Sequence, residues 1–196
     1  MHVLTVCSGN ICRSPAFETL LRSGPLADSG ITVESAGTIA GEGQPVHPEI
    51  AAILADRGVD VAEFASRRLT APMLRSADLV VTMEREHRAT VVQLSPSHVR
   101  RTFTLRELER VMDRFASADT LGTTVDERWS QLLQFGSSLR TPPERPEDDD
   151  IADPINGQRR DFQQAVDEIV EGITAIERVI LDAPPEVRTP VKDRRL

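Results

Sequence analysis

The sequence predicts a three-layer, doubly wound α/β sandwich in which a small parallel sheet of about four strands is flanked by helices. Short β-type runs and helical runs alternate along the chain without an internal repeat. One run, residues 78–83 (Asp-Leu-Val-Val-Thr-Met), is almost continuously apolar, which is typical of a central parallel strand. In this fold class, ligand chemistry is expected at the carboxyl ends of the strands.

The first half of the chain contains two predicted strand-then-helix units. Residues 2–6 form a β-type run that ends at Cys7, and residues 14–22 turn helical after a short loop. Residues 31–35 are expected to form the second strand. Apolar residues at helical spacing then predict a helix over 48–57. The order of strand followed by helix favours a parallel sheet.

The second half continues this alternation. The apolar run 78–83 predicts the third strand, and a helix with a polar face is expected over 84–94. Residues 99–103 form a weaker strand pattern, which is followed by a predicted helix over 105–115. These elements complete a sheet of the size that the fold class requires.

The segment 116–150 has a looser pattern, punctuated by Thr, Ser and Pro. We expect it to be a surface insertion of helix and loop before the last element, with a lid or a partner-docking surface as the alternative. One amphipathic helix is predicted within it from the spacing of Trp129, Leu132, Leu133 and Phe135.

The last predicted helix is the clearest, because its apolar residues recur at steps of three and four. They are Phe162, Val166, Ile169, Ile173, Ile176 and Ile180. The 196 residues fit one domain, which we place at 1–183 with the insertion included. Residues 184–196, rich in proline and mixed charge, are expected to form a disordered tail.

Composition excludes several classes of function. The formal net charge of -8 repels nucleic-acid phosphates, so any anion must be bound by a local device. No apolar stretch reaches the roughly 18 residues of a spanning helix, and the first residues lack a secretion signal. The two cysteines, Cys7 and Cys12, favour reactive thiols in a reducing cytoplasm over a disulfide framework.

The loop after the first strand carries the strongest chemical signal. Residues 7–14 read Cys-Ser-Gly-Asn-Ile-Cys-Arg-Ser, with the spacing C-x5-R-S between a strand and a helix N-terminus. Such a loop turns backbone N–H groups inward, and the helix dipole adds partial positive charge. The loop therefore predicts a cradle for a dianionic phosphoryl group. The alternative is a buried strand-end cysteine beside a surface arginine.

The residue types in this loop suit nucleophilic chemistry at phosphorus. The field of the cradle favours the thiolate of Cys7, which is the nucleophilic form. The planar fork of Arg13 can bind two equatorial oxygens of a phosphoryl group. Ser14 can donate a hydrogen bond to the Cys7 sulfur, both as thiolate and as leaving group.

Transfer of a phosphoryl group from an ester also requires a proton for the leaving oxygen. Asp153, followed by Pro154, is the candidate acid. The alternative for this pair is an ordinary turn or helix start. The presence of the loop favours the catalytic interpretation.

These features together resemble the low-molecular-weight protein tyrosine phosphatases. The resemblance covers about residues 2–115 and 150–180. It is carried by the loop from Cys7 to Pro15, by Ser35-Ala-Gly-Thr38, by Asp78-Leu-Val-Val-Thr-Met83 and by Asp153-Pro154.

The resemblance implies a role for each loop residue. Cys7 is implied to be the nucleophile that forms a phosphocysteine, and Arg13 the group that binds the transition state. Asp153 is implied to be the acid that afterwards activates water. Asn10 would hold the strained loop through side chains such as Ser35. The implied substrate-binding residues are Ser8, Gly9, Asn10, Ile11, Cys12 and Ser14.

Cys12 has two interpretations that stay open. It is either a small core residue or the neighbour that traps an oxidised Cys7 as a reversible disulfide.

The resemblance implies no metal and no organic cofactor. It implies a phosphotyrosine-containing protein as substrate and inorganic phosphate as product, with no nucleic acid and no insertion into a membrane. A bacterial-type tyrosine kinase that controls polysaccharide or cell-wall synthesis is one candidate partner, by analogy alone.

The chain departs from the family pattern at two places besides the long insertion. Ile155 and Asn156 follow Asp153-Pro154, where many members place aromatic rings. The family's His-x-Ala-Arg-Gln stretch reads Phe-Ala-Ser-Arg-Arg over 64–68, which removes a histidine that supports the loop asparagine.

Three alternatives therefore stand beside a phosphotyrosine phosphatase. A protein arginine phosphatase resembles the same family, but that branch tends to carry Thr where this chain has Ile11. An arsenate reductase would need cysteines beyond Cys12, which this sequence lacks. A phosphate-sensing or redox-sensing module would keep the loop without turnover.

Three further polar residues, Glu42, His47 and His87, belong to segments expected near the mouth of the site. A loop histidine such as His47 is expected to face solvent. We assign none of the three a role from sequence.

Overall fold

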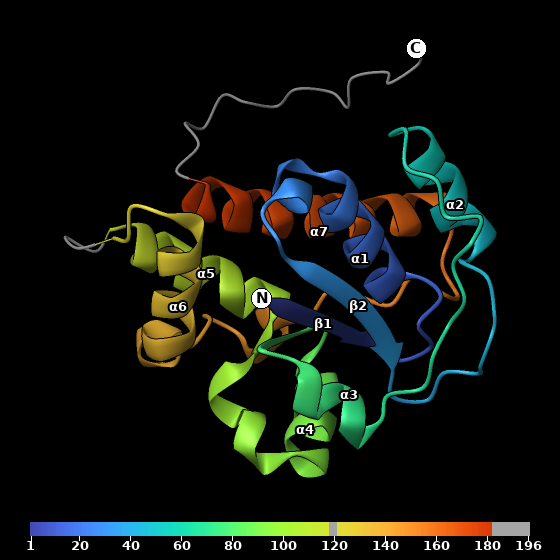
Figure 1. Ribbon diagram of the computed structural model, residues 1–196. Helices are drawn as coiled ribbons and strands as arrows, with labels where there is room; N and C mark the ends of the chain where they lie inside the picture. Colours follow the sequence, from blue (N-terminus) through green and yellow to red (C-terminus); the bar gives the residue numbers. More distant parts are fainter. Residues whose placement is uncertain (118–120, 182–196) are drawn as a thin grey trace.

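The sheet of this protein is fully parallel. The structure is a computed structural model that describes residues 1–117 and 121–181 (Figure 1). In the described residues, one four-stranded sheet has the order β2-β1-β3-β4, and every neighbouring pair is parallel. The strands are β1 (His2–Cys7), β2 (Thr32–Gly37), β3 (Leu79–Thr82) and β4 (Thr102–Thr104). The predicted fold class is confirmed.

Helices cover both faces of the sheet (Figure 1). One layer is built around the last helix, which contacts the first, second and fifth helices along its length. This layer contains α1 (Arg13–Ser23), α2 (Pro48–Ala55), α5 (Leu105–Ala116), α6 (Val125–Phe135) and α7 (Arg159–Ile180). The opposite layer contains α3 (Ala71–Ser76) and α4 (Arg85–Leu94).

The alternation of side chains along β1 explains why two layers are needed. Val3 and Cys7 belong to the larger of two hydrophobic clusters, whereas Leu4 and Val6 belong to the smaller one. Successive side chains of a strand point to opposite faces, so a strand that is apolar at nearly every position must be covered on both.

Helix α7 supplies much of the larger cluster through one apolar stripe. Its members, predicted from their spacing, are all buried: Phe162, Val166, Ile169, Ile173, Ile176 and Ile180. Gly172 lets α7 approach α5 closely, because a Cβ atom there would lie 2.6 Å from the Leu105 side chain. None of the helices in the described ranges is long and apolar enough to cross a membrane.

Two predicted features need correction. The strand expected over 99–103 is wrong in its first three residues, which belong to the 3-10 helix η2 (Pro96–Arg101). Pro96 stands in the first turn of η2, where its fixed φ angle suits a helical start. Helix α3 was not predicted from sequence, although Thr70 caps it and Pro72 lies in its first turn.

The segment 116–150 is more than a surface insertion. Trp129 and Leu132 of α6 are 3% and 1% exposed and belong to the main hydrophobic cluster. Two short 3-10 helices follow, η3 (Gly136–Leu139) and η4 (Pro146–Asp149), and another, η1 (Pro25–Asp28), follows α1. The expected tail 184–196 lies outside the described residues.

The strand order determines where on the sheet a ligand is expected to bind. The chain passes from β1 to β2 on one side and then returns to β3 on the other side of β1. The carboxyl ends of β1 and β3 are therefore adjacent, with Cys7 at the end of β1 and Glu84 two residues beyond β3. Ligands of doubly wound folds bind at such a reversal of strand order.

One half-buried acid in the α7 layer has a carboxylate oxygen without a partner among the described residues. Oε1 of Glu177 is buried and has no hydrogen-bond partner among the described residues. The side chain lies against the end of α1, where a Cβ on Gly24 would be 2.5 Å from Oε1. Burial raises the pKa of Glu177 to about 7. The ionised form therefore destabilises the fold.

We expect Glu177→Gln to stabilise the protein in a pH-dependent way. Because the pKa of Glu177 is higher in the folded than in the unfolded state, the wild type loses stability as pH rises from about 4.5 to 7. The variant should gain roughly 2 kcal/mol in free energy of unfolding at pH 8, because one pKa unit corresponds to about 1.4 kcal/mol and solvent around the half-buried side chain screens part of the shift.

The measurement is denaturant unfolding of both proteins at pH 4, 6 and 8, with the exposed Glu63→Gln variant as control. A gain of equal size at all three pH values would contradict this account of Glu177.

Candidate active site

The loop between β1 and α1 depends on one residue in the left-handed conformation. Asn10 has a φ of 53° and is the one non-glycine residue with positive φ in the described ranges. Asparagine tolerates this conformation better than most side chains. The end of β2 lies against the same loop, because a Cβ on Gly37 would be 2.4 Å from the carbonyl oxygen of Ser8 and 2.9 Å from the Asn10 nitrogen.

Three carbonyl groups of the loop accept hydrogen bonds from backbone N–H groups of neighbouring segments. The carbonyl oxygen of Cys7 accepts from Thr38 N–H at 2.9 Å, and that of Ser8 from Ile39 N–H at 3.0 Å. The carbonyl oxygen of Ile11 accepts from His47 N–H at 2.8 Å. These bonds leave the inner side of the loop to N–H groups, which favours an anion there.

The Cys7 thiol lies at the centre of this loop and is 2% exposed. Its sulfur accepts a hydrogen bond from the Asn10 N–H at 3.3 Å and lies 3.0 Å from Ser14 Oγ. Helix α1 begins at Arg13, so the positive end of its dipole faces the same sulfur. Each of these contacts brings a hydrogen-bond donor or a partial positive charge to the sulfur.

A chain of buried hydrogen bonds orients Ser14 toward that sulfur. The Ser35 hydroxyl donates to Glu18 Oε2 at 2.5 Å, so its oxygen is free to accept from Asn10 Nδ2 at 2.8 Å. The same Nδ2 donates to Ser14 Oγ at 2.9 Å. Because Ser14 Oγ accepts there, its own proton is directed to Cys7. The expected bond between Asn10 and Ser35 is confirmed.

The segment 64–68 supports the loop without the family's histidine. The backbone N–H of Arg67 donates to Asn10 Oδ1 at 2.8 Å. Both ends of the Asn10 amide are therefore bonded, which fixes its orientation. Phe64, which stands in place of the histidine, packs partly buried against the main hydrophobic cluster.

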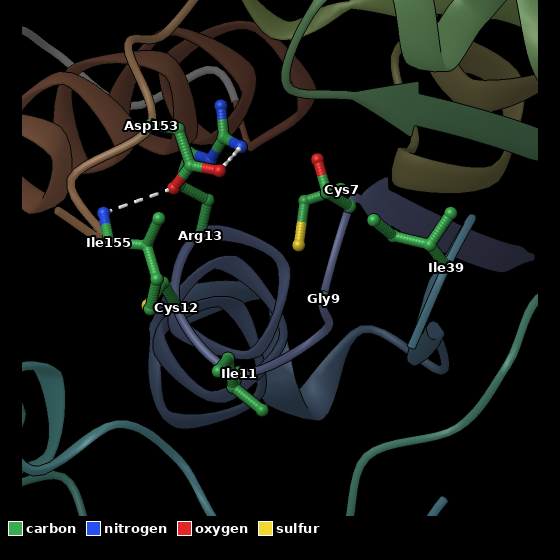
Figure 2. Close-up of a pocket in the computed structure, with 9 residues that line it drawn as sticks. Cys7, Gly9, Ile11, Cys12, Arg13, Ile39, Asp153 and Ile155 are labelled. Atoms are coloured by element: carbon green, nitrogen blue, oxygen red, sulfur yellow. Dashed lines mark hydrogen bonds and ion pairs between the residues drawn. The ribbon is translucent and has the colours of Figure 1, made fainter. Parts of the chain in front are cut away.

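Arg13 is buried and joins three distant parts of the chain. It is 1% exposed, and its guanidinium pairs with Glu84 beyond β3 and with Asp153 Oδ2 at 2.8 Å (Figure 2). It also donates to the carbonyl oxygen of Ile151 at 2.6 Å. Arg13 Nε is buried and has no acceptor among the described residues, so it remains available for a phosphoryl oxygen.

The segment before Asp153 is fixed at three successive residues. Asp149 pairs with Arg110 of α5 at 2.5 Å, and Asp150 forms a bidentate pair with Arg85 at the start of α4. The Ile151 N–H then donates to the carbonyl oxygen of Met83 at 2.8 Å. These anchors hold the end of segment 116–150 in place, which argues against the lid alternative.

A cavity of about 180 Å³ brings the predicted catalytic residues together. Cys7, Arg13 and Asp153 all line it, and Figure 2 shows the Asp153 carboxylate directed to the guanidinium of Arg13. The remaining lining residues are Ser8, Gly9, Ile11, Cys12, Ile39 and Ile155. Asn10 and Ser14, the other two predicted residues, lie behind the wall, where they position the loop.

Three isoleucines form the apolar part of the cavity (Figure 2). Ile11 belongs to the loop itself, Ile39 follows β2, and Ile155 follows Asp153 and Pro154. Ile39 is 71% exposed and Ile155 38% exposed. They provide an aliphatic surface at the mouth of a polar site, where a nonpolar group attached to phosphate could lie.

Cys12 also lines the cavity, and its thiol is free in the structure, as is that of Cys7. Burial, reinforced by the nearby Cys7, raises the pKa of Cys12 to about 12. At neutral pH Cys12 is therefore a neutral thiol. The two cysteines thus differ in role, since only Cys7 accepts hydrogen bonds from Asn10 and the Ser14 hydroxyl.

Sequence reasoning missed Glu84, named His87 without a role and misjudged the surroundings of His47. Glu84 pairs with Arg13, and His87 Nε2 lies 2.8 Å from Ser8 Oγ. Both follow β3, and a polar residue just beyond a central strand was the available signal. His47 faces solvent only in part, because it is half-buried and its ring stacks on Phe162 with centroids 4.6 Å apart.

The model of one protein family, low molecular weight phosphotyrosine protein phosphatase, matches residues 2–119. A Ralstonia solanacearum protein named "Probable low molecular weight protein-tyrosine-phosphatase EpsP" is 36% identical over 108 residues, or 55% of this chain and 72% of that protein. The low molecular weight protein-tyrosine-phosphatase Etp of Escherichia coli K12 is 43% identical over 94 residues, 48% of this chain and 62% of that protein.

A solved structure shares the fold of this chain over most of its length. The YwlE arginine phosphatase from Geobacillus stearothermophilus superposes with a TM-score of 0.65 at 27% identity, covering 92% of this chain and 93% of that one. The family match spans more than half of the present chain and includes the whole loop from Cys7 to Ser14. The chain therefore belongs to the low molecular weight phosphotyrosine protein phosphatase family.

Proposed function

We propose that this protein is a cysteine-dependent phosphomonoesterase that removes phosphate from phosphotyrosine in proteins. The observation that supports it most directly is the meeting of Cys7, Arg13 and Asp153 in one cavity. These residues come from the end of β1, the start of α1 and the segment before α7. They supply a nucleophile, a cation for the phosphoryl group and an acid.

In the first step, the Cys7 thiolate attacks phosphorus as the bond to the tyrosyl oxygen breaks. Asp153 transfers its proton to that leaving oxygen, and a phosphocysteine and a free tyrosine result. Arg13 and the N–H groups of the loop bind the equatorial oxygens, where negative charge gathers in the transition state. No metal or organic cofactor takes part in this proposal.

In the second step, water attacks phosphorus and the bond to the Cys7 sulfur breaks. Asp153, now a carboxylate, takes a proton from the attacking water. Inorganic phosphate is released and the thiolate is restored. The Ser14 hydroxyl and the Asn10 N–H stabilise the sulfur as it leaves, at 3.0 and 3.3 Å in the resting structure.

Substrate binding is expected to disturb the ion pair between Arg13 and Asp153. In the resting structure the guanidinium binds the carboxylate at 2.8 Å. A phosphoryl dianion in the loop competes for that guanidinium and repels the carboxylate. Both effects weaken the ion pair and release the carboxyl group toward the leaving oxygen.

The apolar wall favours an aryl ester over phosphoarginine. Ile11, Ile39 and Ile155 offer contact area to a phenyl ring but no acceptor for the guanidinium N–H groups of phosphoarginine. The YwlE structure is nevertheless that of an arginine phosphatase, so a protein arginine phosphatase remains the second candidate.

We also propose a cytoplasmic location, which suits the free thiols of Cys7 and Cys12. A bacterial-type tyrosine kinase is the proposed partner.

The proposal predicts Cys7-dependent turnover of phosphotyrosine peptides. The experiment compares phosphotyrosine, phosphoserine and phosphoarginine peptides of one sequence, with wild type and Cys7→Ser. Removal of the nucleophile should lower kcat by at least about a thousandfold while inorganic phosphate still binds, because the cradle remains. Preference for phosphoarginine would establish the second candidate. An active Cys7→Ser protein would disprove the mechanism.

Asp153→Asn should affect substrates in proportion to how much their leaving group needs a proton. We expect kcat/KM for phenyl phosphate to fall by roughly a hundredfold or more, and that for para-nitrophenyl phosphate by much less. Asp148→Asn is the matched control, since Asp148 lies in the same segment but pairs with Arg145 away from the cavity. Equal losses on both esters would argue against Asp153 as the acid.

The aliphatic rim should contribute to binding of the aryl group. Ile39→Ala and Ile155→Ala are each expected to raise KM for a phosphotyrosine peptide by about three- to tenfold, because each loses apolar contact with the ring. The affinity for inorganic phosphate should not change. Leu94→Ala is the control, because Leu94 is an apolar residue of α4 away from the cavity whose exposure of 45% lies between those of Ile39 and Ile155. An unchanged KM in both rim variants would show that the ring lies elsewhere.

A further inference from the structure

One buried histidine contacts the phosphoryl-binding loop from α4, in the helix layer opposite to α1. His87 belongs to α4, is 3% exposed, and its Nε2 lies 2.8 Å from Ser8 Oγ. Ser8 follows the nucleophile directly and lines the cavity. The carbonyl oxygen of Ser8 is held by the Ile39 N–H, so the hydroxyl is the part of Ser8 whose direction remains to be set.

The surroundings of the His87 ring decide which nitrogen carries the proton. Burial lowers the pKa of His87, so the ring is neutral at neutral pH. Nδ1 is buried without a partner among the described residues. An unpaired acceptor is tolerated better in a protein interior than an unpaired N–H donor, which favours the proton on Nε2. Glu84 Oε2, 3.7 Å from Nε2, favours the same tautomer.

The charged groups around the ring do not reverse this assignment. Glu84, Glu86 and Asp153 favour a proton on the ring, whereas Arg13 opposes it. Of the three acids, Glu84 is the one with an oxygen within 4 Å of a ring nitrogen among the described residues, and it faces Nε2 rather than Nδ1. A ring with its proton on Nε2 donates to Ser8 Oγ. The Ser8 hydroxyl proton is then free to point elsewhere.

We propose that His87 is a positioning residue that holds the Ser8 hydroxyl as a donor to a phosphoryl oxygen in the loop. Nε2–H donates to Ser8 Oγ, and Ser8 O–H donates into the cavity. The loop thereby gains a side-chain donor beside its backbone N–H groups and Arg13. The inference rests on the proposed function, because it assigns a phosphoryl group to this cavity.

A double-mutant cycle tests the inference through the affinity for inorganic phosphate, measured by calorimetry and by competitive inhibition. Ser8→Ala removes the donor, and we expect about a tenfold loss, as for a hydrogen bond to a charged group. His87→Ala should cost about as much. Combining the two changes should cost no more than either alone, because His87 acts through Ser8.

His98→Ala is the matched control for loss of a buried histidine. His98 of η2 is 6% exposed, and its Nδ1 lies 2.8 Å from Oγ of Ser95, the residue before η2, away from the cavity. Its removal should leave phosphate affinity unchanged. His87→Gln, whose amide N–H can replace Nε2–H, should restore most of the affinity lost in His87→Ala.

Three results would overturn the inference. They are a further tenfold loss when His87→Ala is added to Ser8→Ala, unchanged phosphate affinity in Ser8→Ala, and ring ¹⁵N signals of wild-type His87 that place the proton on Nδ1. The last two measurements need no change at His87, so they remain decisive even if His87→Ala fails to fold. Because phosphate binding is measured directly, failure on phosphotyrosine peptides alone would bear on the proposed function and not on His87.

Discussion

The site depends on the conformation of Asn10. Its left-handed backbone turns the loop so that its N–H reaches the Cys7 sulfur, and its side chain is bonded to Ser14, Ser35 and the Arg67 N–H. A strained residue of this kind persists only where its surroundings fix it. Gly37 is part of those surroundings, because any side chain there would displace the loop.

Arg13 extends this constraint to the rest of the molecule. Its guanidinium joins the loop to Glu84 beyond β3 and to the segment of Ile151 and Asp153. These acids offset a buried positive charge that would otherwise be costly. An acidic protein can thus keep a cation ready for an anionic group. Local N–H groups and one arginine attract phosphate, although the molecule carries a net charge of -8.

Much of this could be predicted from sequence, and the exceptions have physical reasons. The loop from Cys7 to Ser14 is contiguous, so its spacing alone indicates its chemistry. The contacts of Glu84 and His87 arise because β3 lies beside β1. No local sequence pattern indicates the order of the strands, so these contacts could not be predicted. Residues 99–101 resemble a strand but follow Pro96, which starts a 3-10 helix. The helix expected around Trp129 is present, but the loose pattern of 116–150 did not show that Trp129 packs in the core.

The central claim is that the sulfur of Cys7 carries the phosphoryl group between the two steps. The most direct measurement is rapid acid quenching of the enzyme during turnover of an aryl phosphate, followed by intact-mass and peptide analysis. The account predicts a transient adduct of one phosphoryl group on the peptide that contains Cys7. Turnover with no adduct, or an adduct on another residue, would contradict it.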